Sequence, residues 1–290
     1  MPELPEVETV VRGLRKSLPG RRVVSVRLEK TDFIDDPAAL ERDLPGKTIA
    51  DVRRYGKFLL FDLQSPEGAA GNQSAMLVHL GMTGQLILSA PEAPVASHTH
   101  VFFGLDDGSE LRYRDVRRFG RIAMLANGDR EKSLGGLGLD PLEMTATQFA
   151  EKLRGRRARI KALLLDQHAL RGVGNIYADE SLWRARIHPV RLAANLLPQE
   201  VQALYRGLQT VLNEAIRLRG SSVSDYVDSE GACGSFQLKH RVYQRHGEKC
   251  SRCGSTIRRA IVAGRSSHFC PTCQRAPRKL SSRGKRHAHR

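Results

Sequence analysis

The chain has 290 residues, enough for two domains that each bury a core of their own. Its 47 Lys and Arg residues outnumber its 31 Asp and Glu residues, which favours a polyanionic partner such as a nucleic acid, although a ribosome-associated or membrane-surface protein would share this charge. The sequence contains no early apolar signal segment and no run of about 18 apolar residues, so we expect neither secretion nor a membrane span. Four of the five cysteines stand in two close pairs, which is typical of a cytoplasmic protein that binds a metal.

The first eight residues, MPELPEVE, place a potential nucleophile at the start of a helix. Removal of Met1 would leave Pro2 with a free secondary amine, a group that titrates at roughly 8 and can attack an electrophilic carbon to form an iminium. Glu3 and Glu6 are nearby carboxylates, and Pro5 suits a first helical turn. The alternative is an ordinary helix with a proline and acids at its positive end. An apolar stripe of helical period extends this helix to residues 19–20.

After this helix the hydrophobic period changes to two, which predicts short strands. The expected strands are 22–29, 48–54, 57–63, 75–80, 85–89, 100–105, 110–114 and 121–126. Eight strands and one helix indicate a β-sandwich with a flanking helix over residues 1–128.

Several segments of this half combine basic and apolar side chains. Lys57 begins an apolar strand, where a lysine is most often a solvated strand end. Met82 lies in the glycine-containing segment HLGMTG and would by itself fill a gap in the core. The segment RYRDVRRFG, residues 112–120, interleaves arginines with aromatic residues. Such a pattern can form the outward face of an edge strand, or it can supply cations for phosphates and wedges for a duplex from which a base has been extruded.

Residues 129–141 are rich in glycine and are expected to link two domains. Beyond them the hydrophobic period predicts helices from Thr145 to about Leu153 and over 159–166, 176–185 and 198–218, in a helical domain of residues 142–236 that ends in a long loop. The turn Gly172-Val173-Gly174-Asn175 could bind a phosphate through the unpaired N–H groups of the next helix, although such a turn needs glycine for steric reasons alone.

Two cysteine pairs, Cys250-x2-Cys253 and Cys270-x2-Cys273, stand sixteen residues apart. Four thiolates at this spacing predict one tetrahedral Zn2+, and because no coordination position stays open, the metal should be structural. The segment between the pairs is expected to form a hairpin with Arg265 at its tip, either as a phosphate contact or as a solvated turn. We therefore expect a zinc finger over residues 237–275. Residues 274–290 carry seven Lys and Arg and no acid, so the tail from 276 onward is expected to be disordered.

These motifs, from PELPEVE through LDQ…GVGNIYADE to the four cysteines, closely resemble those of the formamidopyrimidine-DNA glycosylases, bacterial enzymes that excise oxidised purines. The resemblance covers roughly residues 1–275. It implies an α+β fold with an N-terminal β-sandwich, a C-terminal helix–two-turn–helix domain and a zinc-finger hairpin. The catalytic residues that it implies are Pro2, Glu3, Glu6, Lys57 and Arg265. The DNA contacts that it implies are His79, Met82, His98, Arg117, Phe119, Arg156, Asn175 and Tyr243. The implied zinc ligands are Cys250, Cys253, Cys270 and Cys273. The resemblance also implies that the long loop over residues 219–236 closes over the extruded base as a lesion-capping loop.

The implied function is that of a DNA glycosylase and abasic-site lyase that acts on double-stranded DNA containing oxidised purines. A monomer is the default expectation for the oligomeric state. The implied reaction passes through a Schiff base at Pro2, followed by β- and δ-elimination. Two alternatives stay open. One is the pyrimidine-directed sister family, endonuclease VIII, which typically begins PEGPE and lacks the wedge residues Met82, Arg117 and Phe119. The other is a zinc-ribbon DNA-binding protein without catalytic activity.

Overall fold

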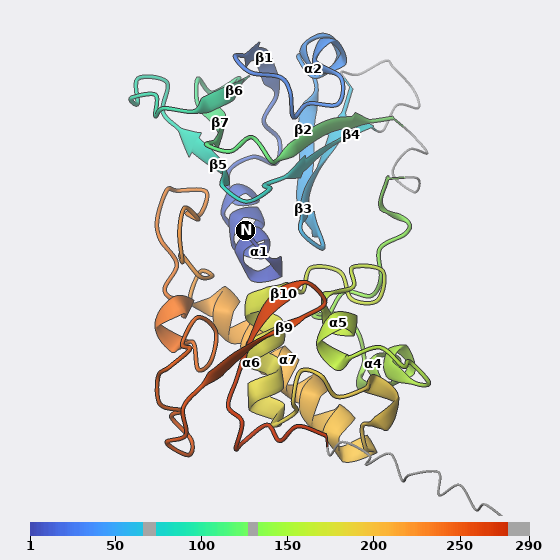
Figure 1. The fold of residues 1–290 in the computed structure, drawn as a ribbon. Coiled ribbons are helices and arrows are strands. Elements are labelled where there is room, and N and C mark those ends of the chain that lie inside the picture. The colour runs from blue at the N-terminus through green and yellow to red at the C-terminus, as the bar shows by residue number, and fades with distance from the viewer. Residues whose placement is uncertain (66–73, 127–132, 278–290) are drawn as a thin grey trace, which may run out of the picture.

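The computed structural model describes residues 1–65, 74–126 and 133–277. A β-sandwich lies above a helical body that carries the zinc-finger hairpin, and helix α1 (Leu4–Leu14) lies where the two meet (Figure 1). Part of the predicted linker and most of the predicted tail fall outside the described residues. Within the described ranges, no helix combines the length and the apolar character that crossing a membrane requires.

The sandwich consists of two antiparallel four-stranded sheets. One sheet has the order β1 (Val23–Leu28), β6 (Thr99–Leu105), β7 (Glu110–Asp115) and β5 (Gly84–Ser89). The other has the order β2 (Thr48–Tyr55), β3 (Phe58–Gln64), β4 (Ser74–His79) and β8 (Arg121–Leu125). Each predicted strand is present, with both ends within one residue of the prediction. The alternating apolar side chains that predicted the strands fill the space between the sheets, as Val52, Phe61 and Phe103 illustrate.

Two features of this half differ from the prediction. Helix α1 ends at Leu14, and turns occupy the residues before Pro19, although Leu18 still packs in the sandwich core. A second helix, α2 (Pro37–Asp43), was not predicted. Asp36 caps its start, because the Asp36 carboxylate accepts the N–H of Ala39. The helix buries only Leu40, so it has no apolar period that could have indicated a helix.

The helical body contains α4 (Ala146–Leu153), α5 (Ile160–Leu165), α6 (Asn175–Ala185) and α7 (Pro198–Arg217), in agreement with the predicted helices. Short 3-10 turns lie at Ala193–Asn195 and Phe236–Lys239. The core between these helices also contains Leu4, the first residue of α1, whereas Val7, Val10 and Val11 of the same helix belong to the sandwich core. Helix α1 therefore anchors the N-terminus in both cores at once.

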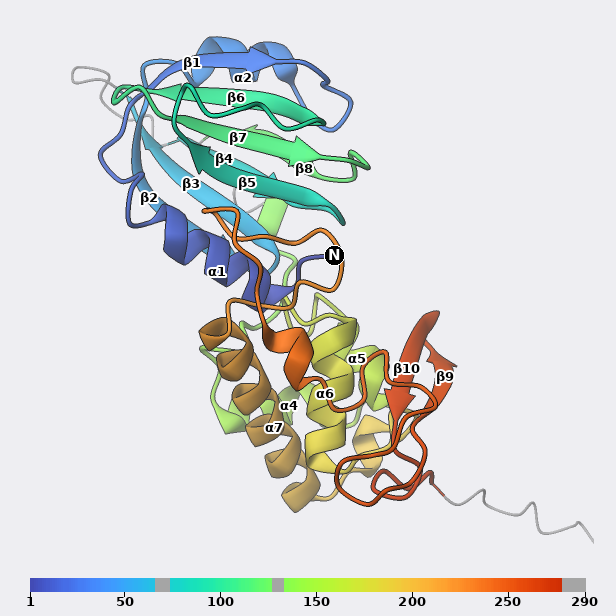
Figure 2. The ribbon, with the colours of Figure 1, turned by 90° about the vertical axis from the view of Figure 1, so that its left-hand side faces the viewer.

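The zinc-finger hairpin pairs β9 (Arg258–Val262) with β10 (Arg265–Phe269) and lies alongside α6 (Figure 2). The turn itself is made by Ala263 and Gly264, both with positive φ. Arg265 is therefore the first residue of β10, paired with Val262, and not the tip of the turn as predicted.

Candidate active site

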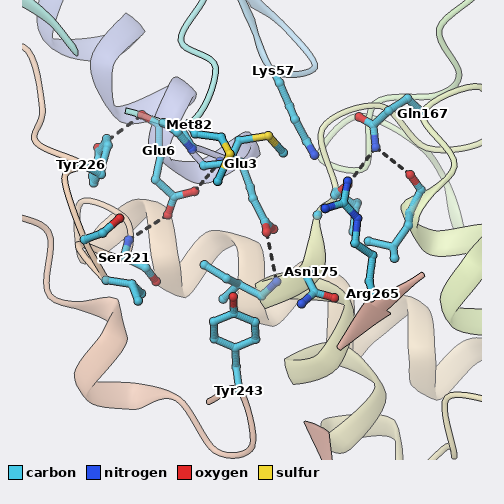
Figure 3. A pocket seen from close by; sticks show the side chains of 18 of the residues that line it. Glu3, Glu6, Lys57, Met82, Gln167, Asn175, Ser221, Tyr226, Tyr243 and Arg265 are labelled. Carbon is cyan, nitrogen blue, oxygen red and sulfur yellow. Dashed lines mark hydrogen bonds between the residues drawn. The ribbon is translucent and has the colours of Figure 1, made fainter. Parts of the chain in front are cut away.

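A cavity of about 840 Å³ lies between the sandwich and the helical body, at the start of α1 (Figure 3). Nine of the thirteen residues predicted as catalytic or DNA-binding line this cavity, namely Pro2, Glu3, Glu6, Lys57, His79, Met82, Asn175, Tyr243 and Arg265. The other four, His98, Arg117, Phe119 and Arg156, lie outside it.

Glu3 is buried and directed into the beginning of α6. Its carboxylate accepts the backbone N–H of Ile176 at 3.0 Å and of Tyr177 at 3.4 Å, both donors that a helix start leaves unpaired. These amides therefore bind a carboxylate of the protein, so the predicted role of the turn amides as a phosphate site is wrong for these two groups. The close approach requires glycine at position 174, because a Cβ there would lie 2.2 Å from Glu3 Cδ. Burial raises the pKa of Glu3, with Lys57 and the two N–H groups opposing the rise.

Glu6 lies behind Glu3 and is surrounded by donors from both bodies. Its carboxylate accepts the backbone N–H of Glu3 at 2.8 Å, the hydroxyl of Tyr177, and the backbone N–H of Ser221 at 2.8 Å. Burial, and then the neighbouring Glu3, raise the pKa of Glu6 to about 7. The carboxyl group can therefore gain or lose a proton near neutrality. Neither Tyr177 nor Ser221 was predicted, because both are far from Glu6 in the sequence.

Lys57 and Arg265 supply cations to the cavity from two different elements: Lys57 enters from the turn before β3 and Arg265 from the hairpin (Figure 3). Burial lowers the pKa of Lys57, while the charges of Glu3 and Glu6 act against this shift. The side chain is thus not the solvated strand end that is common for a lysine at such a position.

His79 is held as a neutral ring. Its pKa falls to about 4, mainly through burial and also through the charges of Lys57 and Arg121. Because Nδ1 accepts the backbone N–H of Gly81 at 3.2 Å, the proton of the neutral ring lies on Nε2, which can donate a hydrogen bond to a ligand in the cavity.

The predicted wedge residues occupy two loops that contact each other. A Cβ at Gly81 would lie 2.4 Å from the backbone of Phe119, so the turn before Met82 packs directly on the loop that carries Phe119. The ring of Phe119 is 57% exposed and Met82 is 39% exposed, which is unusual for large apolar side chains and suits insertion into a partner. The guanidinium of Arg117 lies 4.5 Å from the centre of the Phe119 ring.

Asp115, which was not predicted, fixes this pair of loops. Its fully buried carboxylate accepts the hydroxyl of Thr83 at 2.5 Å and the backbone N–H groups of Arg117 at 3.2 Å and Gly120 at 2.9 Å. No sequence motif indicates this role, because a carboxylate that binds loop amides looks like any other acid at the end of a strand.

A buried ion pair places Arg265. Lys161 on α5 donates to the carbonyl of Ser266 at 2.7 Å and contacts Asp179 on α6 at 2.6 Å. Asp179 in turn accepts the backbone N–H of His268 at 2.8 Å. Both charged side chains are almost completely buried, so the part of β10 that follows Arg265 is held to α5 through Ser266 and to α6 through His268. Neither Lys161 nor Asp179 was assigned a role from the sequence.

The four predicted zinc ligands lie together, with all Sγ atoms within 4.8 Å of one another. Tetrahedral coordination at a Zn–S distance of about 2.3 Å requires sulfur atoms roughly 3.8 Å apart, so the cluster fits one Zn2+. Trp183, Val242 and Ile257 pack around it. Bound zinc would join the two cysteine pairs that precede and follow the hairpin, and four thiolate ligands would leave no open coordination position for catalysis.

Comparison with known proteins identifies the family of this arrangement. Family models match residues 1–122 (formamidopyrimidine-DNA glycosylase N-terminal domain), 137–227 (formamidopyrimidine-DNA glycosylase H2TH domain) and 247–276 (zinc finger found in FPG and IleRS). The formamidopyrimidine-DNA glycosylase of Pelotomaculum thermopropionicum is 46% identical over 281 residues, covering 95% of this chain and 99% of its own. The chain belongs to the formamidopyrimidine-DNA glycosylase family.

Solved structures of the family are also similar in fold to this chain. A Lactococcus lactis FPG mutant in complex with Fapy-dG-containing DNA is 36% identical and has a TM-score of 0.85, over 95% of this chain and all of the other. A MutM complex with carbocyclic 8-oxo-G-containing DNA is 36% identical, with a TM-score of 0.84 and the same coverage. Enzymes of the formamidopyrimidine-DNA glycosylase family are bifunctional glycosylases and abasic-site lyases, and this zinc-finger protein is a DNA-repair enzyme of that class. The endonuclease VIII-like and non-catalytic alternatives are set aside.

Proposed function

We propose that the protein excises oxidised purines, including 8-oxoguanine and formamidopyrimidines, from double-stranded DNA, and that Pro2 is the nucleophile. The observation that carries this proposal is the position of the first six residues. Pro2 is buried at the wall of the cavity, next to two acids whose carboxylates accept backbone N–H groups of the helical body and of the loop that follows α7. With Met1 attached the Pro2 nitrogen is an amide, so the proposed nucleophile is the amine that removal of Met1 frees.

The chemistry follows from this placement. The neutral amine of Pro2 attacks C1′ of the deoxyribose, and Glu3, whose raised pKa favours retention of a proton, protonates the ring oxygen so that the sugar opens and the base leaves. The resulting iminium acidifies the C2′–H bond, and β- and then δ-elimination release the phosphates on the two sides. Glu6 orients the Glu3 main chain and can exchange a proton near pH 7.

We assign the remaining predicted residues to DNA. Lys57 and Arg265, which were predicted as catalytic, would steady the phosphates and the leaving groups of the reaction. His79, Asn175 and Tyr243, which also line the cavity, would contact phosphates next to the extruded nucleotide. Met82, Arg117 and Phe119 would fill the space that the extruded base leaves in the duplex. His98 and Arg156, both exposed and away from the cavity, would contact phosphates farther along.

The same proposal covers the organisation of the chain. The proposed units are a catalytic sandwich (1–128), a linker (129–141), a helical domain with its long loop (142–236), a zinc finger (237–275) and a basic tail (276–290). We propose that the enzyme acts as a monomer, in the cytoplasm, where chromosomal DNA is found in bacteria.

Borohydride trapping tests the nucleophile. A duplex with a single 8-oxoguanine is incubated with the enzyme and borohydride, and the cross-linked peptide is mapped by mass spectrometry. We expect an adduct on the amine of Pro2, and none with a chain extended by a few residues before Met1, in which the nitrogen stays an amide. DNA binding without any adduct, even on a premade abasic site, would overturn the assignment. Faster excision of thymine glycol than of 8-oxoguanine opposite cytosine would overturn the purine preference.

A further inference from the structure

The loop between α7 and the 3-10 turn at Phe236, residues 219–235, is here called the strap. Both of its ends belong to the helical body. Ser235 donates its backbone N–H to Leu218 O and Phe236 donates to Gly220 O, each at 2.9 Å, which closes the loop at its base. From this base the strap rises beside α1 and reaches β5 of the sandwich (Figure 2).

The middle of the strap is bound to the sandwich. β5 is an edge strand, so one row of its backbone groups has no partner within the sheet, and the N–H of Leu88 donates to Ser229 O at 3.1 Å. The side-chain amide of Gln85, also on β5, donates to Asp225 O. Between these two contacts, Tyr226 is buried in the sandwich core, and its hydroxyl donates to Glu6 O at 3.3 Å.

Helix α1 leaves room for this docking. A Cβ at Gly13 would lie 1.9 Å from Ser229 Oγ and 3.2 Å from Ser229 Cβ, so a larger residue at position 13 would displace this part of the strap. Ser229 is itself only 4% exposed, so it is buried against α1 at this position.

Gln85 is the one side chain of β5 that fixes the strap, and its own orientation is set from the other side. Arg114 on β7 donates to Gln85 Oε1 at 3.1 Å, which directs Nε2 toward Asp225 O. Gln85 is 5% exposed and its hydrogen bond to Asp225 O is partly buried, so the loss of its N–H would leave this carbonyl without its donor.

The docked strap forms one wall of the cavity. Val223 and Ser224 line it directly, two residues or fewer before the Gln85 contact at Asp225, and Ser221 binds Glu6. Under the proposed function, the extruded base would lie against these residues. The sugar and the phosphates, in contrast, would contact α1, Lys57 and the hairpin on the other sides.

We propose that Gln85 is a positioning residue that, with Gly13 and the edge of β5, holds the strap against the extruded base, and so determines the rate of base excision but not of strand cleavage at an abasic site. This inference rests on the proposed function. The physical reason for the separation is that an abasic site has no base for the strap to contact, whereas both substrates need the same amine, acids and cations.

The test compares two single-turnover rates, excision from a duplex with 8-oxoguanine and cleavage of a premade abasic site. Gln85→Met keeps the length of the side chain and removes the hydrogen-bond donor. Gly13→Leu introduces a residue that favours the helix, and its side chain fills the space that Ser229 occupies. We expect either variant to lower excision about tenfold, as the loss of one buried hydrogen bond allows, with abasic cleavage within about twofold of the wild-type rate. Hydrogen exchange at the Leu88 amide should be faster in both.

Gln209→Met is the matched control, because Gln209 also donates from its side-chain amide to a backbone carbonyl, that of Pro141, away from the strap. Both rates should be unchanged in this control. Unchanged excision in Gln85→Met and Gly13→Leu, or an equal fall of both rates, would overturn the inference and make Gln85 an ordinary contact between domains. Absence of both activities in the wild type would instead contradict the proposed function.

Discussion

The carboxylate of Glu3 accepts the backbone N–H of Ile176 at 3.0 Å, although 173 residues separate them. The bond places the acid beside Pro2 at the positive end of α6, where helix N–H groups stabilise its charged form while burial opposes it. The start of α1 and the start of α6 thus form one structural unit. Four predictions follow from this unit and from the elements that support it.

Glu3→Gln should separate chemistry from stability. The amide oxygen can still accept the shorter bond, from the N–H of Ile176, whereas the amide nitrogen replaces the oxygen that accepts the longer bond from Tyr177. The free energy of unfolding should therefore fall by about 1 to 3 kcal/mol, the cost of one buried donor left without an acceptor. Since the variant has no proton to give to the sugar oxygen, excision of 8-oxoguanine should fall by about 10² to 10⁴. Cleavage of a premade abasic site, where the base is already absent, should fall less. Equal losses on the two substrates would contradict the role as the acid for base release.

The free energy of unfolding should depend on pH through Glu6. A pKa raised from 4.5 to about 7 means that the folded protein keeps a proton that the unfolded chain loses above pH 4.5. This contribution to stability is therefore present below pH 4.5 and is lost as the pH rises to about 7, at a total cost of about 3 kcal/mol. Urea denaturation of wild type and Glu6→Gln at pH 5 and pH 8 should reveal it. Relative to the wild type, the variant should have a higher free energy of unfolding at pH 8 than at pH 5. If the difference in free energy of unfolding between the two proteins is the same at both pH values, Glu6 does not titrate as described.

Lys161→Met should weaken DNA binding indirectly, although Lys161 is buried, because it contacts the strand that carries Arg265. The variant leaves Asp179 buried without its cation, which costs about 3 to 5 kcal/mol of stability, and it frees the carbonyl of Ser266 beside Arg265. Calorimetric or chemical unfolding should detect the first effect, and fluorescence anisotropy with a lesion duplex the second.

The double variant Lys161→Met/Asp179→Leu is the companion measurement. It removes both charges, so part of the stability should return, while DNA affinity should stay low because β10 lacks both anchors. Recovery of affinity along with stability would show that the pair does not position Arg265.

Cys270→Ser should release zinc and lower DNA affinity together, since the hairpin that carries Arg265 depends on the cluster. Cys233→Ser is the control, because Cys233 is exposed on the strap and belongs to no cluster of ligands within the described residues. Metal content by mass spectrometry and binding by anisotropy should fall in the first variant only. A zinc-free Cys270→Ser protein that binds a lesion duplex with normal affinity would refute the structural role of the metal.

The sequence alone was enough to predict the strands of the sandwich, the helices α4 to α7 and the zinc cluster. Each of these depends on residues close to one another in the chain: a period of two between buried positions, a period of 3.6, or two Cys-x2-Cys pairs. The seven residues of α2 were missed for the same reason, since one buried leucine makes no period. The resemblance of all the matched motifs, from PELPEVE to the cysteine pairs, to a known family located nine residues of one cavity without saying how they meet.

Only the tertiary structure decided which groups bind each other across the two bodies. Helix α6 could have offered its first amides to a phosphate, but the packing of Leu4 into the helical core brings Glu3 to them instead. Lys161 and Asp179 are charged residues on helices, and nothing near them in the sequence shows that β10 will cover them. The contact of Gln85 with Asp225 spans 140 residues. Such pairs depend on how buried surfaces fit together, a property of the whole chain that the local spacing of residues does not contain.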